Sequence, residues 1–164
     1  MGPSDRSAWA EMRAALWPED SLQTHAEEVD GLLGSEDFWA FIAETSDGAP
    51  VGFAEVAIRK YANGCITRPV PFLEGIWVKA EFRRQGVGAR LIETAEAFLA
   101  DRGFREIGSD AQIENRDSHA AHAGWGFSET ERVVYFRKAI HPVRSPLAGE
   151  NGAPDLHGCT PSEG

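Results

Sequence analysis

A basic, glycine-containing turn follows an apolar run near the middle of the chain. Residues 83–88 read Arg-Arg-Gln-Gly-Val-Gly, and the apolar residues Leu91, Ile92, Ala95 and Phe98 follow at helical spacing. Free N–H groups at a helix N-terminus, glycines that leave room for a ligand and the helix dipole together favour a bound phosphate. The sequence therefore predicts an anion-binding loop between a strand and a helix.

Two better-known phosphate loops are excluded by spacing. The chain has no Gly-x-x-x-x-Gly-Lys-Ser/Thr segment, so it does not contain a P-loop. The dinucleotide fingerprint Gly-x-Gly-x-x-Gly also fails, because Leu91 stands where a third glycine would follow Gly86 and Gly88.

Two carboxylates stand where a polar acceptor site could form. Glu74 interrupts the apolar run of residues 72–76, where an unpaired buried carboxylate costs several kcal/mol. Asp110 ends a short predicted strand just before a loop. Each carboxylate could hold an ammonium group or accept its proton. Glu74 could instead face solvent or bond to a neighbouring amide, and Asp110 could cap a turn or helix.

Charge distribution favours a cationic ligand over nucleic acid. The net charge of the 164-residue chain is -10, with 42% hydrophobic residues and a mean hydropathy of -0.34. Between Arg13 and Arg59 there is no Lys or Arg, while ten carboxylates fall in that span: Glu19, Asp20, Glu27, Glu28, Asp30, Glu36, Asp37, Glu44, Asp47 and Glu55. An acidic half beside a basic loop suggests two ligands of opposite sign, although a solvated acidic surface remains the alternative.

The cysteines, the lack of targeting segments and the composition of the C-terminal residues indicate the cellular compartment and the domain organisation. The two cysteines, Cys65 and Cys159, lie far apart without metal-ligand spacing, and neither a signal peptide nor an apolar run of membrane-spanning length is present. We therefore expect a cytoplasmic protein without a metal site. Residues 1–140 are predicted to form one domain, and residues 141–164, rich in Gly, Pro and Ser, a flexible tail.

The elements that would position these groups alternate between helices and strands. Helices are predicted at about residues 5–16, 21–33, 86–101 and 118–123, and strands at 38–44, 51–59, 72–78, 106–110 and 133–138. Ser21 or Thr24 is expected to cap the second helix, and residues 45–48 to form a hairpin turn.

This order of elements and the loop pattern Arg/Gln-x-x-Gly-x-Gly/Ala resemble the GNAT superfamily of N-acetyltransferases. A narrower resemblance, to aminoglycoside 6'-N-acetyltransferases of the chromosomal enteric and soil type, spans about residues 9–138. It is carried by Leu16-Trp17-Pro18, Tyr61-x-Asn63-Gly64-Cys65, Val70-Pro71-Phe72-Leu73-Glu74-Gly75-Ile76, Ser109-Asp110, Glu114-Asn115, Gly126-Phe127 and Glu129-Thr130-Glu131-Arg132-Val133. It implies an α/β fold with a mixed, mostly antiparallel twisted sheet flanked by helices. The family's N-terminal strand is expected to be absent or reduced here.

The resemblance also implies ligands and residues. Acetyl-CoA would lie against the strand of Ile76, Trp77 and Val78, with its pyrophosphate on the loop formed by Arg83, Arg84, Gln85, Gly86, Val87, Gly88 and Ala89. The aminoglycoside would contact Trp17, His25, Tyr61, Glu74, Asp110, Asn115 and Glu131, and Asn115 could touch the cofactor as well. Trp17 could instead be core, and Glu131 a solvated carboxylate.

The implied reaction is direct attack of an amine on the thioester, with antibiotic resistance as its consequence. Glu74 or Asp110 is the expected base, and a backbone amide near Trp77 or Val78 the expected oxyanion donor. His122 replaces the tyrosine that many members use to protonate the leaving thiolate, although a surface histidine is equally compatible with the sequence. A homodimer is implied. Two alternatives remain: acetylation of another polycationic amine, such as a polyamine or lysine side chain, and a non-catalytic acyl-CoA-binding regulator.

Overall fold

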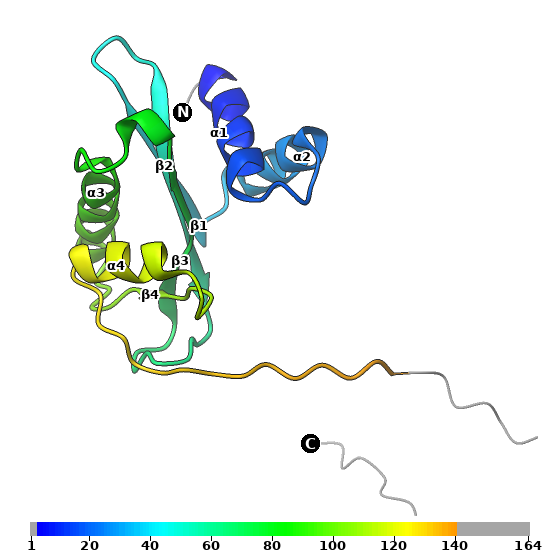
Figure 1. Cartoon of the computed structure of the whole chain (residues 1–164), viewed down its shortest axis with the longest axis vertical. Coiled ribbons are helices and arrows are strands. Elements are labelled where there is room, and N and C mark those ends of the chain that lie inside the picture. The colour runs from blue at the N-terminus through cyan, green and yellow to red at the C-terminus, as the bar shows by residue number, and fades with distance from the viewer. Residues whose placement is uncertain (1–2, 141–164) are drawn as a thin grey trace, which may run out of the picture. The chain divides into compact units, whose positions relative to one another are not determined.

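The computed structural model describes residues 3–140 (Figure 1). Its elements in chain order are α1 (Pro3–Leu16), α2 (Leu22–Leu32), β1 (Phe38–Glu44), β2 (Pro50–Arg59), β3 (Val70–Val78), the 3-10 helix η1 (Ala80–Phe82), α3 (Val87–Asp101), β4 (Gly108–Ser109) and α4 (Arg116–Gly124). The chain divides into two compact units, one ending at Arg132 and the other beginning at Val133, and all of these elements belong to the first. Within the described range, no strand precedes α1.

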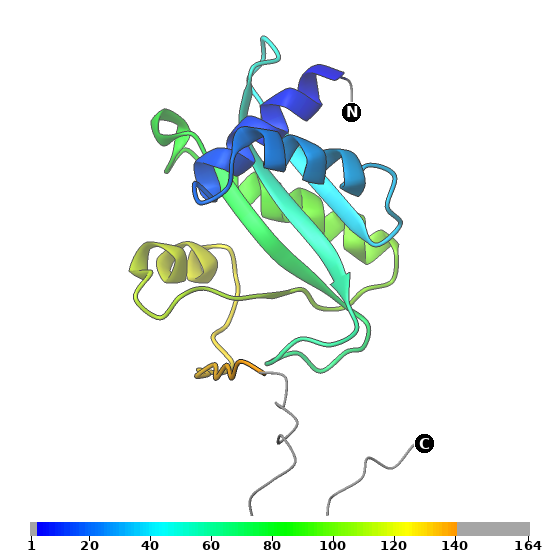
Figure 2. The same ribbon diagram turned by 90° about the vertical axis from the view of Figure 1, so that its right-hand side faces the viewer.

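The four strands form one mixed sheet in the order β1-β2-β3-β4. The first three strands are antiparallel neighbours, whereas β4 pairs in parallel with β3 after the crossover through α3. Helices α1 and α2 lie over one face of the sheet and α3 over the other (Figures 1 and 2). This confirms the predicted mixed, mostly antiparallel sheet flanked by helices.

Each face of the sheet has its own hydrophobic core, because side chains alternate along β2. Phe53 packs with Trp9, Met12 and Val29 under α1 and α2. The next residue, Ala54, belongs to the opposite core beneath α3, which also contains Val56, Leu73, Leu91, Ile92, Ala95 and Leu99. The two cores fix the sheet between its helices and so position the groups that the strands carry.

A bulge interrupts the pairing of β2 with β3. Glu55 is opposite Gly75 and Val56 is opposite Leu73, so Glu74 has no partner in the register. An extra residue of this kind bends the strand and redirects a side chain. Glu74, which interrupts the apolar run in the sequence, thus also interrupts the pairing between β2 and β3.

Helix caps explain two boundaries. Ser21 caps α2, since its side chain accepts from the Thr24 N–H at 3.1 Å. Asn115 caps α4 in the same way, accepting from the Ser118 N–H at 3.0 Å. Of the two residues proposed for the α2 cap, Ser21 is therefore correct.

Two strand predictions need correction. The strand expected at residues 106–110 is only Gly108–Ser109, because β3 pairs with β4 through Phe72 and Leu73 alone. The strand expected at residues 133–138 is absent from the described structure: those residues have no strand partner, and Val134, Tyr135 and Phe136 are exposed. Apolar alternation indicates a strand only when a neighbouring strand supplies hydrogen bonds. The predicted tail, residues 141–164, lies outside the described residues.

Candidate active site

The predicted anion loop forms the N-terminus of α3. Gly86 precedes the helix in a left-handed conformation, with φ 83°, and the first helical hydrogen bond runs from the Arg90 N–H to the Gly86 carbonyl at 3.0 Å. The N–H groups of Val87, Gly88 and Ala89 precede this first helical donor, so they have no acceptor within the helix. Beyond Gly86 lies open space, since a Cβ added there would meet nothing within 4 Å.

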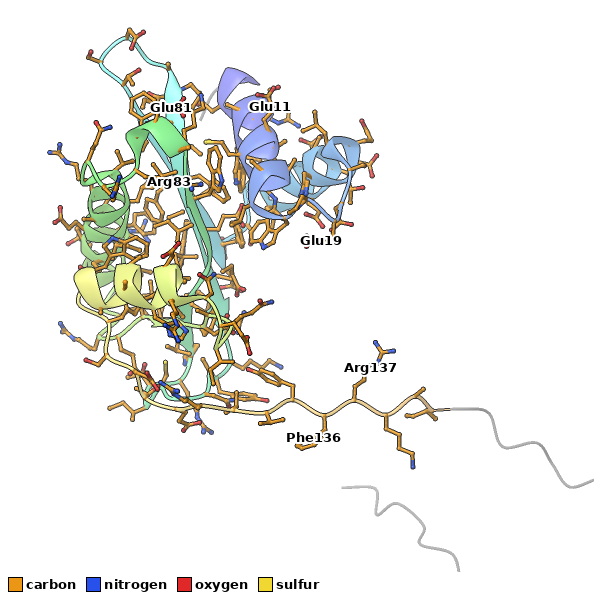
Figure 3. The ribbon with its side chains drawn as sticks, viewed as in Figure 1. Glu11, Glu19, Glu81, Arg83, Phe136 and Arg137 are labelled. Atoms are coloured by element: carbon orange, nitrogen blue, oxygen red, sulfur yellow. The ribbon has the colours of Figure 1, made fainter. Side chains whose placement is uncertain are left out.

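Side-chain contacts to backbone hold this loop in place. The Arg83 Nε donates to the Val78 carbonyl at 2.9 Å, and the Gln85 amide donates to the Glu81 carbonyl at 2.6 Å. Arg83 lies between η1 and α3 (Figure 3). Both residues were predicted as cofactor contacts, and the structure gives each of them a loop-stabilising bond as well. Arg84, with φ 58°, is the one non-glycine residue of the described chain with positive φ.

The edge of β3 that leads toward this loop is open. On its β4 side, β3 pairs only through Phe72 and Leu73, so the stretch with Ile76, Trp77 and Val78 has no strand partner there among the described residues. An extended ligand could add to such an edge as a further strand would. This stretch of β3 is thus free of a strand partner on the side where the prediction places acetyl-CoA.

Gly88 has a packing role that the sequence did not reveal. A Cβ at this position would lie 2.7 Å from the Trp125 indole, whereas Gly86 has no such neighbour. Open space therefore lies at Gly86, whereas Gly88 allows the close approach of α3 to Trp125.

A pocket of about 750 Å³ lies on the α1 and α2 face of the sheet. It is lined by Arg13, Trp17, Asp20, His25, Glu28, Gly31, Leu32, Phe38, Glu55, Ala57 and Glu74. The side chains that line the pocket include four carboxylates and one guanidinium. Three of them, Asp20, Glu28 and Glu55, belong to the acidic stretch of the sequence, so part of that stretch faces a cavity.

A buried ion pair forms one wall of this pocket. Arg13 Nη1 donates to both carboxylate oxygens of Glu55 at 2.6 Å, and the Trp9 indole N–H donates to the same carboxylate at 2.6 Å. Arg13 Nη2 donates to Glu28 at 2.6 Å. Burial raises the pKa of Glu55, and the charge of Arg13 acts against that rise.

Glu74 also faces a cation. Arg59 donates to it through Nε at 2.8 Å and NH2 at 2.5 Å, and the guanidinium carbon lies 3.5 Å from the centroid of the Phe72 ring. Its side chain is 26% exposed, so this carboxylate is both paired and open to the pocket.

Trp17 and His25 complete the aromatic side of the pocket. Their rings stack at 6.5 Å, and the Arg13 guanidinium lies 4.8 Å from the Trp17 ring. His25 is buried, with Nε2 at 2.9 Å from the Trp17 carbonyl and Nδ1 at 3.5 Å from Glu28. Trp17 packs so closely on the sheet that a Cβ at Gly75 would lie 2.6 Å from it.

The structure does not bring the other predicted acceptor residues into this pocket. Tyr61 is 64% exposed in the loop between β2 and β3, and Asp110 is exposed just after β4. Asn115 caps α4, which accounts for it without a ligand. Glu131 is exposed beyond α4.

His122 is half-buried and has a defined set of partners. Its Nδ1 lies 2.8 Å from the Ser118 carbonyl, and its Nε2 lies 2.8 Å from the Ser109 hydroxyl. The rings of Trp125 and Phe127 lie 5.5 and 5.1 Å from the imidazole. This arrangement favours a positioned group over a solvated surface histidine.

Several residues of the site were missed in the sequence. Arg13, Asp20, Glu28, Glu55 and Arg59 border the described pocket or pair within it, and Ser109 pairs with His122. Glu55 carried the same signal as Glu74, a carboxylate inside an apolar strand. The others have no distinguishing pattern, because their partners lie on different elements.

The described residues contain neither a candidate metal centre nor a candidate membrane span. No cluster of three His, Cys, Asp or Glu side chains is placed to hold a metal ion over residues 3–140. Nor does any helix in that range have the length and apolar character needed to cross a membrane.

Comparison with known proteins agrees with this geometry. The acetyltransferase (GNAT) family matches residues 6–127. Aminoglycoside N(6')-acetyltransferase type 1 of Serratia marcescens is 48% identical over 134 residues, which are 81% of this chain and 92% of the relative. The protein of the same name from Stenotrophomonas maltophilia is 43% identical over 141 residues, covering 85% and 91% of the two chains.

Solved structures give the same result. The aminoglycoside antibiotic 6'-N-acetyltransferase AAC(6')-Ih from Acinetobacter baumannii superposes with a TM-score of 0.80 at 39% identity, covering 86% of this chain and 96% of that one. AAC(6')-Iy, in complex with the bisubstrate analog CoA-S-monomethyl-acetylneamine, superposes with a TM-score of 0.79 at 38% identity over 85% and 95% of the chains. The chain therefore belongs to the GNAT family of acetyltransferases, alongside the aminoglycoside N(6')-acetyltransferases.

Proposed function

We propose that this protein is an aminoglycoside 6'-N-acetyltransferase that moves the acetyl group of acetyl-CoA directly to the 6'-amino group of its substrate. One observation carries the proposal: 48% identity to an aminoglycoside N(6')-acetyltransferase over 92% of that relative. The described pocket adds chemical support, because four carboxylates against one guanidinium suit a polycation. Acetylation of the drug would give antibiotic resistance.

The two ligands are proposed to meet beside β3. The pyrophosphate of acetyl-CoA binds the N–H groups at the start of α3, and the pantetheine arm follows the open edge past Val78, Trp77 and Ile76. Its thioester then comes close to Gly75 and the bulge at Glu74. The acceptor enters from the α1 and α2 face, where Trp17 supplies a ring for the sugar faces.

We also propose roles for individual residues of the site. Glu74 and Asp110 anchor ammonium groups or take the proton of the reacting amine, directly or through water. A backbone N–H near Trp77 or Val78 stabilises the oxyanion. Tyr61, Asn115, Glu131 and His25 are proposed acceptor contacts, of which only His25 lines the described pocket. Holding both substrates in line supplies much of the rate.

Two wider features are also proposed. The segment from Val133 to Ile140 exposes Val134, Tyr135 and Phe136, and Phe136 and Arg137 project from opposite sides of it (Figure 3). An extended apolar segment without a strand partner can be covered by a second copy, so we propose a homodimer. We place the protein in the cytoplasm, where acetyl-CoA is available, and the catalytic domain at residues 1–140 with residues 141–164 as a tail.

The test is a comparison of three amines in one assay. Thiol release from acetyl-CoA is followed with kanamycin, spermidine and a lysine peptide at matched concentrations. Turnover with kanamycin at a kcat/KM far above the other two is expected. Turnover with spermidine or the peptide but not kanamycin would favour another polycationic amine. Binding of acetyl-CoA without turnover of any amine would favour the acyl-CoA-binding regulator.

A further inference from the structure

The hydrogen bonds of His122 determine where its protons lie. A carbonyl oxygen can only accept, so the Nδ1 that lies 2.8 Å from the Ser118 carbonyl carries a hydrogen. In the neutral imidazole the opposite nitrogen, Nε2, then carries no hydrogen. Its lone pair accepts a hydrogen bond from the Ser109 hydroxyl at 2.8 Å. In the imidazolium, Nε2 also carries a hydrogen and donates to the Ser109 oxygen.

The hydroxyl proton of Ser109 therefore has two orientations. It points to Nε2 when His122 is neutral. When His122 is charged, its Nε2–H points at the Ser109 oxygen, so the Ser109 proton can no longer point to Nε2. The other protein acceptor within reach of this proton is the Leu73 carbonyl, at a long 3.5 Å. So weak a bond leaves the proton available to a stronger acceptor. Charging His122 thus frees the Ser109 hydroxyl proton from Nε2, so that the hydroxyl can donate to a bound ligand.

Ser109 stands where the two strands part. It pairs with Leu73, the last residue of β3 that β4 contacts, and β3 is open beyond that point. The proposed path of the pantetheine arm runs along this edge from Val78 toward Gly75, so it brings the thioester sulfur to the end where Ser109 lies. The bulge at Glu74 marks the same place on the strand.

We propose that Ser109 gives the departing thiolate of CoA its proton and that His122 replaces the proton through Nε2. The inference rests on the proposed function and deepens it. It also assigns His122 a positioning and resupplying role in place of direct contact with the sulfur.

The proton steps balance. The amine nitrogen forms its bond to the acetyl carbonyl carbon and loses a proton to the base, and the carbon–sulfur bond breaks with its electron pair on sulfur. The Ser109 proton moves to the sulfur to give the CoA thiol, while the Nε2 proton of the imidazolium moves to the Ser109 oxygen. Ser109 ends as a hydroxyl and His122 as a neutral ring protonated on Nδ1.

The surroundings of His122 are two serines and two aromatic rings. Its hydrogen-bond partners are Ser109 and Ser118, and the rings packed on it are Trp125 and Phe127. Within the described chain no charged side chain makes a hydrogen bond, ion pair or ring contact with it. The two rings can support a cation through their π faces.

A matched pair of serine variants on the same histidine tests the relay. Ser109→Ala removes the hydroxyl at Nε2, whereas Ser118→Ala removes only a 3.3 Å hydroxyl contact and keeps the Ser118 carbonyl on Nδ1. We expect Ser109→Ala to lower kcat at least ~10-fold with little change in acetyl-CoA KM, and Ser118→Ala to stay within about 2-fold of wild type.

The second readout separates a relay from a structural role. The pH profile of kcat should be the same in Ser118→Ala as in the wild type, and it should change in the same way in Ser109→Ala and His122→Gln, because both of these variants break the relay. The double variant should be no slower than the slower single variant, because the two groups act as one unit. A Ser109→Ala enzyme with the kcat and pH profile of Ser118→Ala would overturn the relay.

The assay uses whichever amine the wild type accepts, because every acceptor leaves the same thiolate. A wild-type preference for spermidine or the lysine peptide would overturn the proposed function, while the comparison of Ser109 with Ser118 would still decide the relay.

Discussion

Arg59 and Glu74 are joined by two hydrogen bonds, from Nε at 2.8 Å and NH2 at 2.5 Å, at the point where β3 bulges. The carboxylate proposed to receive a substrate ammonium is therefore already paired with a cation of the protein. A polycation that binds Glu74 must share it with Arg59 or displace Arg59. This relationship makes the role of Glu74 testable.

Substitutions of the two partners should have opposite effects. Arg59→Gln removes the competitor, so the aminoglycoside KM should fall several-fold. Glu74→Gln removes the anchor, so that KM should rise at least ~10-fold, since a charge-assisted bond contributes about 1.5–3 kcal/mol. Acetyl-CoA KM serves as the internal control. If both variants changed the aminoglycoside KM in the same direction and to the same extent, the pair would be structural only.

Asp110 offers a separate test, because its carboxylate is exposed after β4 and has no ion-pair partner in the described chain. Asp110→Asn should lower kcat/KM for the aminoglycoside at least ~10-fold and leave acetyl-CoA affinity unchanged. An effect on kcat together with loss of its acidic limb would indicate a base, and an effect on KM an anchor. Asp117→Asn, an exposed carboxylate in the first turn of α4, is the control. Equal kinetics of the two variants would remove Asp110 from the site.

The two glycines of the anion loop should separate binding from stability. Gly86→Ala adds a side chain facing open space at φ 83°, so it should raise acetyl-CoA KM, with a strain of about 1–2 kcal/mol. Gly88→Ala places its Cβ against Trp125, so it should chiefly lower the free energy of unfolding. Gly124→Ala, with open space and no positive φ, is the control. Unchanged cofactor affinity in Gly86→Ala, measured by calorimetry, would contradict the loop assignment.

The buried ion pair under the pocket predicts unequal effects on stability. Glu55→Gln replaces an oxygen that accepts from Arg13 with an amide NH₂ group that cannot accept, and should cost about 3 kcal/mol in the free energy of unfolding. Glu28→Gln breaks the bond to the same guanidinium at a carboxylate whose side chain is 44% exposed, and should cost under about 1 kcal/mol. Urea unfolding of both variants at neutral pH measures the difference. Equal losses would show that burial does not set the energetics of this cluster.

The raised pKa of Glu55 predicts the direction in which stability changes with pH. Its pKa is raised by burial, so the folded chain holds a proton that the unfolded chain releases at the ordinary glutamate pKa. The contribution of Glu55 to the free energy of unfolding therefore falls as pH rises from that ordinary value through the raised one. Subtracting the Glu55→Gln profile isolates the effect, and a difference that grew with pH in this window would contradict it.

The sequence predicted those features whose residues are close together along the chain. The anion loop was predictable because Gly86, the preceding strand and the following helix are consecutive, and Glu74 because a carboxylate broke an apolar run. Glu55 carried the same signal in β2. The bonds of Arg13 to Glu55 and of Arg59 to Glu74 join different elements, so no spacing along the chain could reveal them.

What the sequence did not show has the same cause. Residues 133–138 alternate like a strand but have no strand partner in the described chain, and no local pattern indicated that Gly88 packs against Trp125. In both cases the outcome depends on what lies opposite in space, and the local pattern does not contain that information.

The central claim is that acetyl transfer takes place at the 6'-amino group, and the most direct measurement compares neomycin with paromomycin. These two aminoglycosides differ in carrying an amino or a hydroxyl group at the 6' position. Acetylation is followed by thiol release and by NMR of the product. We expect neomycin to be acetylated at its 6'-nitrogen and paromomycin to show a kcat/KM lower by several orders of magnitude. Similar rates for the two compounds, or an acetyl group on another nitrogen of neomycin, would contradict the account.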